Sequence, residues 1–422
     1  MTSAISIGKQ DFASLRENHY FYVDKTDFIR QWWESGDDIT LITRPRRFGK
    51  TLNMSMLNCF FSRQYAEKGT IFEGLSIWKQ EKYRRLQGIY PVIFLSFADV
   101  KQNNYQDAVQ KIKNIIVDAY RQHRYLEQEE CFTQNEKQQM LEITEKMSDV
   151  TAQDALKNLS SYLNLLYGKK VLIFLDEYDT PMQEAYIHGY WDEFVGFMRS
   201  LFNATFKTNP YLERAVMTGI TRISKESVFS DLNNLTVITT TSDAYADCFG
   251  FTEEEVFQSL DQFGMPEKKD LVKQWYDGFC FGTHRDIYNP WSITNYLKEK
   301  KLRPYWAATS SNGLISKLLQ LASVNMKEEL EKLINRQQIV VNFDEQIIFG
   351  QLEQDESAVW SLLVASGYLK VEEIEYRGLT LEPWYSLSIT NLETVSMFSN
   401  MFKSWFAAAS ANYNEFIKAM LN

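Results

Sequence analysis

The sequence is poor in cysteine and has no long hydrophobic run. Its four cysteines, Cys59, Cys131, Cys248 and Cys280, are far apart, and none forms a CxxC pair. This spacing excludes a disulfide framework and a cysteine-ligated zinc site, and it fits a reducing compartment. No stretch reaches the roughly 18–20 unbroken apolar residues of a membrane span, and no basic leader precedes an apolar run at the N-terminus. We therefore expect a cytoplasmic protein with no membrane contact.

Basic residues are also in the minority, which limits the expected partners. The 422 residues include 45 lysines and arginines against 55 acidic residues, a formal net charge of −10. This balance argues against a general nucleic-acid coat protein. The four histidines (19, 123, 188 and 284) lie on separate segments without ligand spacing, so we expect no histidine metal site. The 45% hydrophobic content excludes a disordered chain.

The first 250 residues alternate apolar runs of strand length with longer helical patterns. Expected strands cover residues 39–43, 92–97, 171–175, 215–220 and 235–241. Continuous apolar strands separated by helices predict an α/β fold with a parallel sheet covered by helices on both faces. In such a sheet ligands bind beyond the carboxyl ends of the strands.

The pattern changes near residue 251, where helical segments become dominant. Residues 360–373 (WSLLVASGYLKVEE) predict a helix ended by Gly367 and followed by an extended run, typical of a small winged-helix-like unit. We therefore divide the chain into a core (1–250), a helical lid (251–326), and a winged-helix-like and C-terminal helical segment (327–422).

The strongest chemical signal is RPRRFGKT at residues 44–51. A P-loop has the pattern GxxxxGK[ST] between a strand and a helix, so that backbone N–H groups surround a phosphate. Lys50 is expected to pair with β- and γ-phosphate oxygens, and the Thr51 hydroxyl to join a Mg²⁺ shell. Arg44 occupies the first glycine position, so the pattern is incomplete, and a solvated basic loop is the alternative. The expected nucleotide-binding residues are Pro45, Arg46, Arg47, Phe48, Gly49, Lys50 and Thr51.

Two further strand ends complete the expected site. The apolar run 171–175 ends in Asp176 and Glu177, for which we predict Mg²⁺ coordination and activation of the attacking water, respectively. Asp179 is expected to cap a helix or support the site. Arg222, in MTGITRIS (217–224), is the candidate sensor of the γ-phosphate, with Thr218 as a weaker polar sensor. An ordinary acidic turn and a surface arginine are the respective alternatives.

With these motifs the chain resembles the bacterial AAA-ATPase-like family. The resemblance rests on residues 21–29, 44–51, 175–179, 218–235, 249–256, 275–282, 287–293 and 366–369. It implies a P-loop ATPase core with strand order 5-1-4-3-2, followed by a helical lid and a winged-helix-like unit. The arginine-bearing loop is normal in this family, which favours a nucleotide site. A lid proline contacts the nucleotide in related ATPases. Pro290 matches it, although a proline is also common at the start of a helix.

Two functions follow from this interpretation. The first is Mg²⁺-dependent ATP binding and hydrolysis, with Glu177, Lys50 and Arg222 as catalytic residues, coupled to movement of the lid and C-terminal unit. The alternative is a nucleotide-gated switch or scaffold with little turnover, which controls a partner or a fused effector domain. The expected partners are ATP or ADP, together with a protein partner or further copies of the same chain. Many acidic residues in 327–376 argue against nucleic-acid binding there. Family members often carry a C-terminal PD-(D/E)XK nuclease-like domain. No acidic pair after residue 376 fits one, so we expect no nuclease activity.

Overall fold

The computed structural model describes residues 3–223, 228–229, 232–306, 315, 318–319, 322–346 and 356–407, with side chains up to residue 399. The chain forms two compact units. The sheet unit comprises Gly8–Thr43 and Lys50–Ile238. The C-terminal unit comprises Met1–Ile7, Arg44–Gly49 and Thr239–Asn422. The short segment Arg44–Gly49 is thus flanked in the chain by residues of the sheet unit but belongs to the C-terminal unit.

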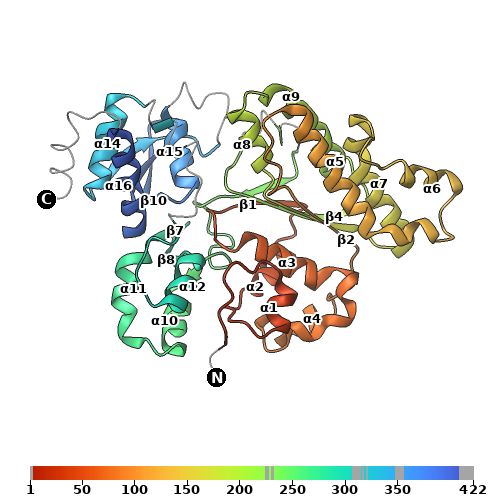
Figure 1. The fold of residues 1–422 in the computed structure, drawn as a ribbon, viewed down its shortest axis with the longest axis horizontal. Coiled ribbons are helices and arrows are strands. Elements are labelled where there is room, and N and C mark those ends of the chain that lie inside the picture. The colour runs from red at the N-terminus through yellow and green to blue at the C-terminus, as the bar shows by residue number, and fades with distance from the viewer. Residues whose placement is uncertain are drawn as a thin grey trace. The chain divides into compact units, whose positions relative to one another are not determined.

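A five-stranded parallel sheet forms the centre of the sheet unit (Figure 1). Its strands are β1 (Ile39–Thr43), β2 (Val92–Ser96), β3 (Val171–Asp176), β4 (Leu212–Gly219) and β5 (Leu235–Ile238). The order is β2-β3-β4-β1-β5, and all neighbouring pairs are parallel. Read from β5, this is the order 5-1-4-3-2 that the family resemblance implies. Every residue of β1 and β3 is buried, which explains why both strands are mostly apolar and have no alternation of polar and apolar residues.

Helices cover both faces of this sheet, as expected for an α/β unit (Figure 1). They are α1 (Phe12–Glu17), α2 (Asp27–Ser35), α3 (Lys50–Phe61), α4 (Glu81–Arg84), α5 (Tyr105–Gln122), α6 (Gln134–Leu141), α7 (Asp149–Tyr167), α8 (Thr180–Ile187) and α9 (Trp191–Phe202). In the described part of the chain, no helix is both long and apolar enough to cross a membrane. All four cysteines are free thiols.

The expected lid region contains a small antiparallel sheet, so a purely helical lid is wrong. Its elements are β6 (Phe251–Thr252), α10 (Glu253–Gln262), α11 (Lys269–Tyr276), β7 (Phe279–Phe281), β8 (His284–Tyr288) and α12 (Pro290–Glu299). The strand order is β6-β8-β7. Glycines on either side of β7 end the helical pattern, and Phe279 and Phe281 alternate inward around Cys280. Two buried aromatic side chains at a spacing of two residues favour a strand over a helix.

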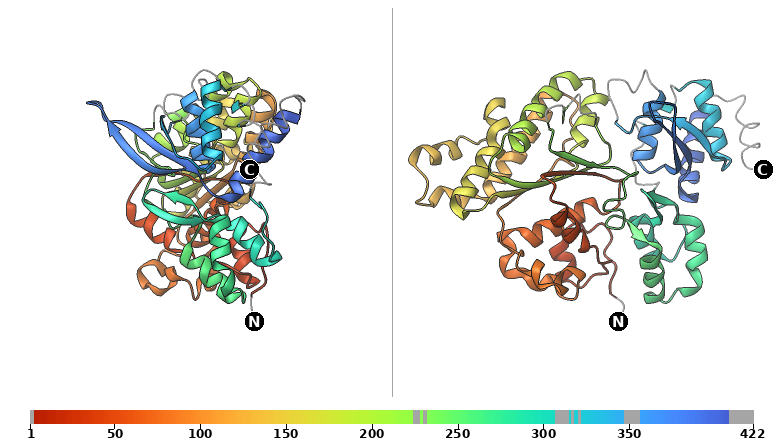
Figure 2. Two further views of the ribbon diagram at one scale, coloured as in Figure 1. Left: turned by 90° about the vertical axis from the view of Figure 1, so that its left-hand side faces the viewer. Right: turned by 180° about the vertical axis from the view of Figure 1, so that it is seen from behind.

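A second antiparallel sheet follows, with the order β10-β11-β9. Its region contains α14 (Val324–Ile334), β9 (Ile339–Asn342), α15 (Glu356–Ala365), β10 (Leu369–Arg377), β11 (Glu382–Ile389) and α16 (Leu392–Ala407). The β10–β11 hairpin extends away from the helices around it (Figure 2). Gly367, with φ of +81°, follows α15 at the position where the sequence predicts a helix end. The boundaries at residues 250 and 326 stay a prediction.

Candidate functional site

Asp176, the last residue of β3, is the centre of a polar cluster in the sheet unit. Its side chain is fully buried. Thr51 Oγ1, in the first turn of α3, donates to Asp176 Oδ2 at 2.7 Å, and Thr218 Oγ1 of β4 donates to Oδ1 at 2.6 Å. Parallel strands place their carboxyl ends at one edge of the sheet, and α3 follows β1 directly after the connecting loop. The fold therefore joins two sequence motifs separated by 125 residues.

Burial has the largest effect on the pKa of the Asp176 carboxyl group. Desolvation raises the pKa of Asp176, and the neighbouring charge of Glu177 raises it further. The hydroxyl groups of Thr218 and Thr51 and the charge of Lys50 oppose this shift in the pKa. A cation bound at this position would favour the ionised form for the same reason that Lys50 does.

Lys50 and Glu177 form an ion pair beside Asp176. Lys50 Nζ lies 3.6 Å from Glu177 Oε1, and the two side chains are 3% and 20% exposed, respectively. Lys50 is therefore almost completely enclosed, while Glu177 keeps access to solvent. One ammonium group faces two adjacent carboxylates, which leaves a net negative charge suited to a divalent cation.

The backbone at Glu177 adopts a left-handed conformation, with φ of +54°. For a residue other than glycine this costs about 1–2 kcal/mol, so surrounding contacts must maintain it. Tyr178 supplies two of them: its backbone N–H donates to the Thr218 carbonyl at 2.9 Å, and its hydroxyl donates to the Thr221 carbonyl at 2.7 Å. A strained backbone held in this way is typical of functional sites.

Asp179 fixes the segment that follows β4. Its Oδ2 accepts hydrogen bonds from the Ile220 N–H (3.0 Å), the Thr221 N–H (2.8 Å) and the Thr221 hydroxyl (2.7 Å). Gln183 Nε2 donates to the same oxygen at 3.0 Å. Burial, followed by the charge of Glu177, raises the pKa of Asp179. Asp179 therefore supports the site, which is one of the two roles that the sequence left open, and its side chain does not cap α8.

Gly219 is required where these two turns approach each other. A Cβ atom at this position would lie 2.6 Å from Asp179 Oδ1 and 2.6 Å from the Tyr178 ring. Both neighbours are fully buried and cannot move aside cheaply. The glycine thus permits the close contact between the end of β4 and the turn after β3.

Arg222 lies three residues after the end of β4 and is half-buried. Its charge acts on the Tyr178 hydroxyl, where it opposes the burial that raises the pKa of that group. The hydroxyl group of Thr218, the weaker candidate sensor, donates a hydrogen bond to Asp176. The role of Arg222 toward a phosphate stays a prediction.

The loop Arg44–Gly49 contains two residues with a left-handed backbone. Arg47 and Gly49 have positive φ angles, of 67° and 82°, on either side of the buried Phe48. Alternation of this kind turns successive N–H groups toward one side of the chain. The Arg47 guanidinium lies 4.3 Å from the ring centroid of Trp291, and Asn289 Nδ2 donates to the Arg46 carbonyl at 3.3 Å. The next residue along the chain, Lys50, begins α3.

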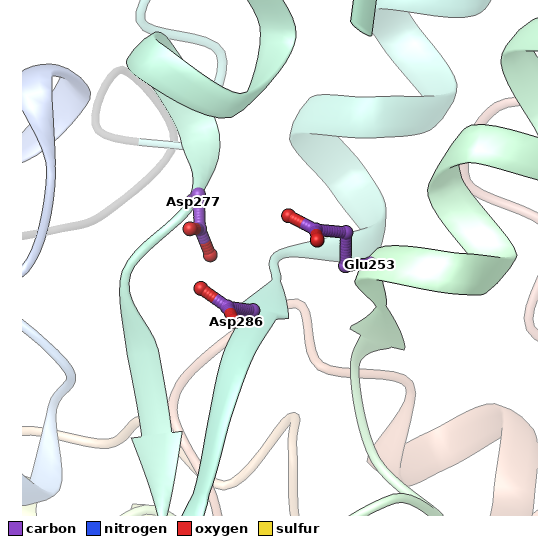
Figure 3. Close-up of side chains that lie close together, drawn as sticks. All are labelled: Glu253, Asp277 and Asp286. Atoms are coloured by element: carbon purple, nitrogen blue, oxygen red, sulfur yellow. The ribbon is translucent and has the colours of Figure 1, made fainter. Parts of the chain in front are cut away.

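A second acidic cluster lies in the C-terminal unit, formed by Glu253, Asp277 and Asp286 (Figure 3). Lys273 provides its counter-charge: the ammonium pairs with Glu253 and lies 3.5 Å from Asp286 and 3.8 Å from Asp277. Burial and the neighbouring Asp286 raise the pKa of Asp277 to about 7. The partly exposed Lys273 therefore supplies a positive counter-charge to this cluster from within the chain.

Sequence reasoning missed Tyr178 and Thr221 as parts of the site. Both lie within segments that carry other predicted site residues, 175–179 and 217–224, but an aromatic ring and a small hydroxyl are common in any folded core and do not by themselves indicate a site. A signal was available in Gly219, because a glycine at the end of a buried strand indicates that another part of the chain approaches closely.

Comparison with known proteins agrees with this geometry. Residues 6–229 match the model of a family described as "Predicted AAA-ATPase". Over 395 aligned residues the chain is 27% identical to the "Uncharacterized protein in vnfD 5'region" of Azotobacter chroococcum mcd 1. The aligned region covers 92% of this chain and 68% of that protein. The family match includes β1 to β4 and all the polar residues described around Asp176, and it spans more than half of the chain. The chain therefore belongs to the AAA-ATPase-like family of predicted AAA-ATPases.

Proposed function

We propose that this protein binds ATP with Mg²⁺ and hydrolyses it. The observation that carries the proposal is the hydrogen bond of 2.7 Å between Thr51 and Asp176, with the Lys50–Glu177 ion pair beside it. This joins the end of the GKT motif to Asp176 and Glu177 at the end of β3. A lysine and threonine at the start of a helix, in contact with strand-end carboxylates, are the arrangement used by P-loop NTPases.

The donor atoms fit a magnesium ion. Mg²⁺ prefers oxygen ligands at about 2.0–2.1 Å in octahedral geometry, so two neighbouring ligands lie about 3 Å apart. The 2.7 Å between Thr51 Oγ1 and Asp176 Oδ2 is close to this separation. Thr51 and Asp176 would hold the ion, which would neutralise charge on the phosphate oxygens.

The chain's own residues then divide the work of hydrolysis. The N–H groups of residues 46–49 and the Lys50 ammonium would bind phosphate oxygens, and binding would draw Lys50 away from Glu177. The Glu177 carboxylate, released from its ion pair, would orient a water molecule and accept its proton. Arg222 would stabilise the charge that develops on the γ-phosphate.

The Lys50–Glu177 ion pair also favours a second candidate, a nucleotide-gated switch with little turnover. A carboxylate that remains paired with a lysine has its oxygen directed at the ammonium group and does not orient a water molecule for attack. In this case ATP or ADP would bind without rapid hydrolysis. Bound nucleotide would then set the conformation that a protein partner, or a second copy of the chain, recognises.

Single-turnover hydrolysis separates these two candidates. The native chain and Glu177→Gln are each mixed, in separate experiments and in excess over labelled ATP, with Mg²⁺. The release of phosphate is followed over time, and nucleotide affinity is measured as the control. Hydrolysis with Glu177 as the base predicts a loss of about 10²-fold or more in rate with affinity retained. Equal rates would remove Glu177 from the mechanism. Slow release by both proteins with tight binding supports the switch.

The C-terminal unit is the proposed output of either mechanism. We interpret α14, β9, α15, β10 and β11 as a winged-helix-like unit, since helices and a three-stranded antiparallel sheet alternate there. Residues 251–326 would act as the lid. The exposed faces of this unit carry many carboxylates, including Glu328, Glu373 and Glu375, which favours a protein partner over a nucleic acid.

A further inference from the structure

Arg44 stands where an ordinary P-loop has its first glycine, and it is fully buried. Its φ angle is not among the positive ones, so the backbone there does not require a glycine. Burial of a guanidinium group is costly unless hydrogen bonds replace its water. Nη1 donates to the Thr239 carbonyl at 2.6 Å and Nη2 to the Ala244 carbonyl at 3.2 Å. Burial lowers the pKa of Arg44 to about 9.

Aromatic rings complete the environment of this guanidinium. The Arg44 Cζ atom lies 4.5 Å from the ring centroid of Phe281 and 5.8 Å from that of Phe249. These distances are within the range of cation–π contacts, which are strongest where water is excluded. The side chain therefore ties the start of the loop to residues 239–249 and to β7.

Strand β7 and Gly250 contact Phe48, near the other end of the loop. The Phe48 ring meets Phe279 edge-on at 4.7 Å and Phe281 at 5.4 Å between centroids. The Gly250 N–H donates to the Phe48 carbonyl at 3.4 Å. Phe281 thus contacts both Arg44 and Phe48, so one ring restrains both sides of the turn that contains the left-handed residue Arg47.

We propose that Arg44 is a positioning residue of the phosphate loop: it replaces the flexibility of the missing glycine with a buried anchor that fixes residues 45–49 in their anion-binding conformation. The inference rests on the proposed nucleotide site and adds how its loop is kept rigid. It differs from the simpler view that an arginine is merely tolerated at this position. Because a preformed loop pays less ordering entropy on binding, loss of the anchor lowers affinity.

Arg44→Gly distinguishes these views, since it restores the ordinary P-loop pattern. The anchor predicts that MgATP affinity, measured by isothermal titration, falls by about ten-fold or more. Arg44→Lys keeps a charge but lacks the planar guanidinium group, whose two terminal nitrogens donate to two different carbonyls, so its affinity falls as well. The matched control is Arg285→Ala, which removes a half-exposed arginine of the same unit together with its ion pair to Glu372. We expect this control to bind MgATP with native affinity. Native or higher affinity in Arg44→Gly overturns the proposal.

Two readouts are independent of a general loss of structure. Millimolar guanidinium chloride, compared with sodium chloride, should partly restore binding to Arg44→Gly but not alter the native chain. Hydrogen exchange without nucleotide should be about ten-fold faster or more at the N–H groups of residues 46–49 in Arg44→Gly, and unchanged in β3. If Arg44→Gly does not fold, Phe281→Leu takes its place and should show the same local increase. Unchanged exchange in the loop refutes the anchor, whereas a native chain that does not bind MgATP refutes only the nucleotide site.

Discussion

Replacement of Asp179 by alanine should loosen the end of β4. The carboxylate is the acceptor for two buried backbone N–H groups, of Ile220 and Thr221, and for the Thr221 hydroxyl. A buried donor that loses its acceptor costs about 1–3 kcal/mol, and water entering the space recovers part of this. We therefore expect Asp179→Ala to destabilise this region by about 2–4 kcal/mol. Asp179→Asn keeps a neutral acceptor and should cost about 1 kcal/mol or less.

Hydrogen exchange at the Ile220 and Thr221 N–H groups measures this effect at the bonds concerned. The expected order of protection is native, then Asp179→Asn, then Asp179→Ala. Asp154→Ala changes an exposed aspartate on α7 in the same way and should stay within about 0.5 kcal/mol of the native chain. Native protection of both N–H groups in Asp179→Ala would refute the reasoning.

Three further results are expected. Gly219→Ala places a methyl group against Asp179 and Tyr178, so the free energy of unfolding should fall by about 1–3 kcal/mol in urea titrations; an unchanged midpoint would show that the contact relaxes. Thr218→Val removes a hydrogen bond that lowers the pKa of Asp176, so MgATP binding should require a higher pH than in the native chain, and identical pH profiles by calorimetry would contradict this. Folding raises the pKa of Asp277 from 3.8 to about 7, so the native state binds more protons between these values and loses stability as the pH rises through them. Asp277→Asn should flatten that dependence in thermal unfolding, and an unchanged slope would exclude the group.

Sequence reasoning brought Thr51 and Asp176 together because one follows a buried strand after a short loop and the other ends a buried strand. In a parallel sheet, chain positions as distant as Thr51 and Asp176 meet at one edge, so strand order and strand ends suffice to bring them together. The role of Asp179 depended on which turn lies beside it, and that is set by the register of β3 and β4 rather than by local sequence. A carboxylate after a strand has the same local pattern whether it caps a helix or binds another turn.

The C-terminal unit was less predictable because its strands are short. β6 and β7 contain two and three residues, too few for a period of two to emerge from the surrounding helical patterns. Burial of Arg44 was equally hidden, since a basic turn with a proline is usually solvent-exposed. Its contacts come from Phe249 and Phe281, about 200 residues further along the chain.

Binding of MgATP to the native chain and to Lys50→Ala, measured by isothermal titration, tests the central claim most directly. Lys50 is buried at the first turn of α3, beside the carboxylates that would hold Mg²⁺. Loss of a charge-assisted contact to phosphate predicts affinity weaker by about ten-fold or more, while Lys146→Ala, an exposed lysine of the same unit, should bind as the native chain does. Equal affinity of the native and Lys50→Ala proteins, or no binding by the native chain, would contradict a nucleotide site at the ends of β1 and β3.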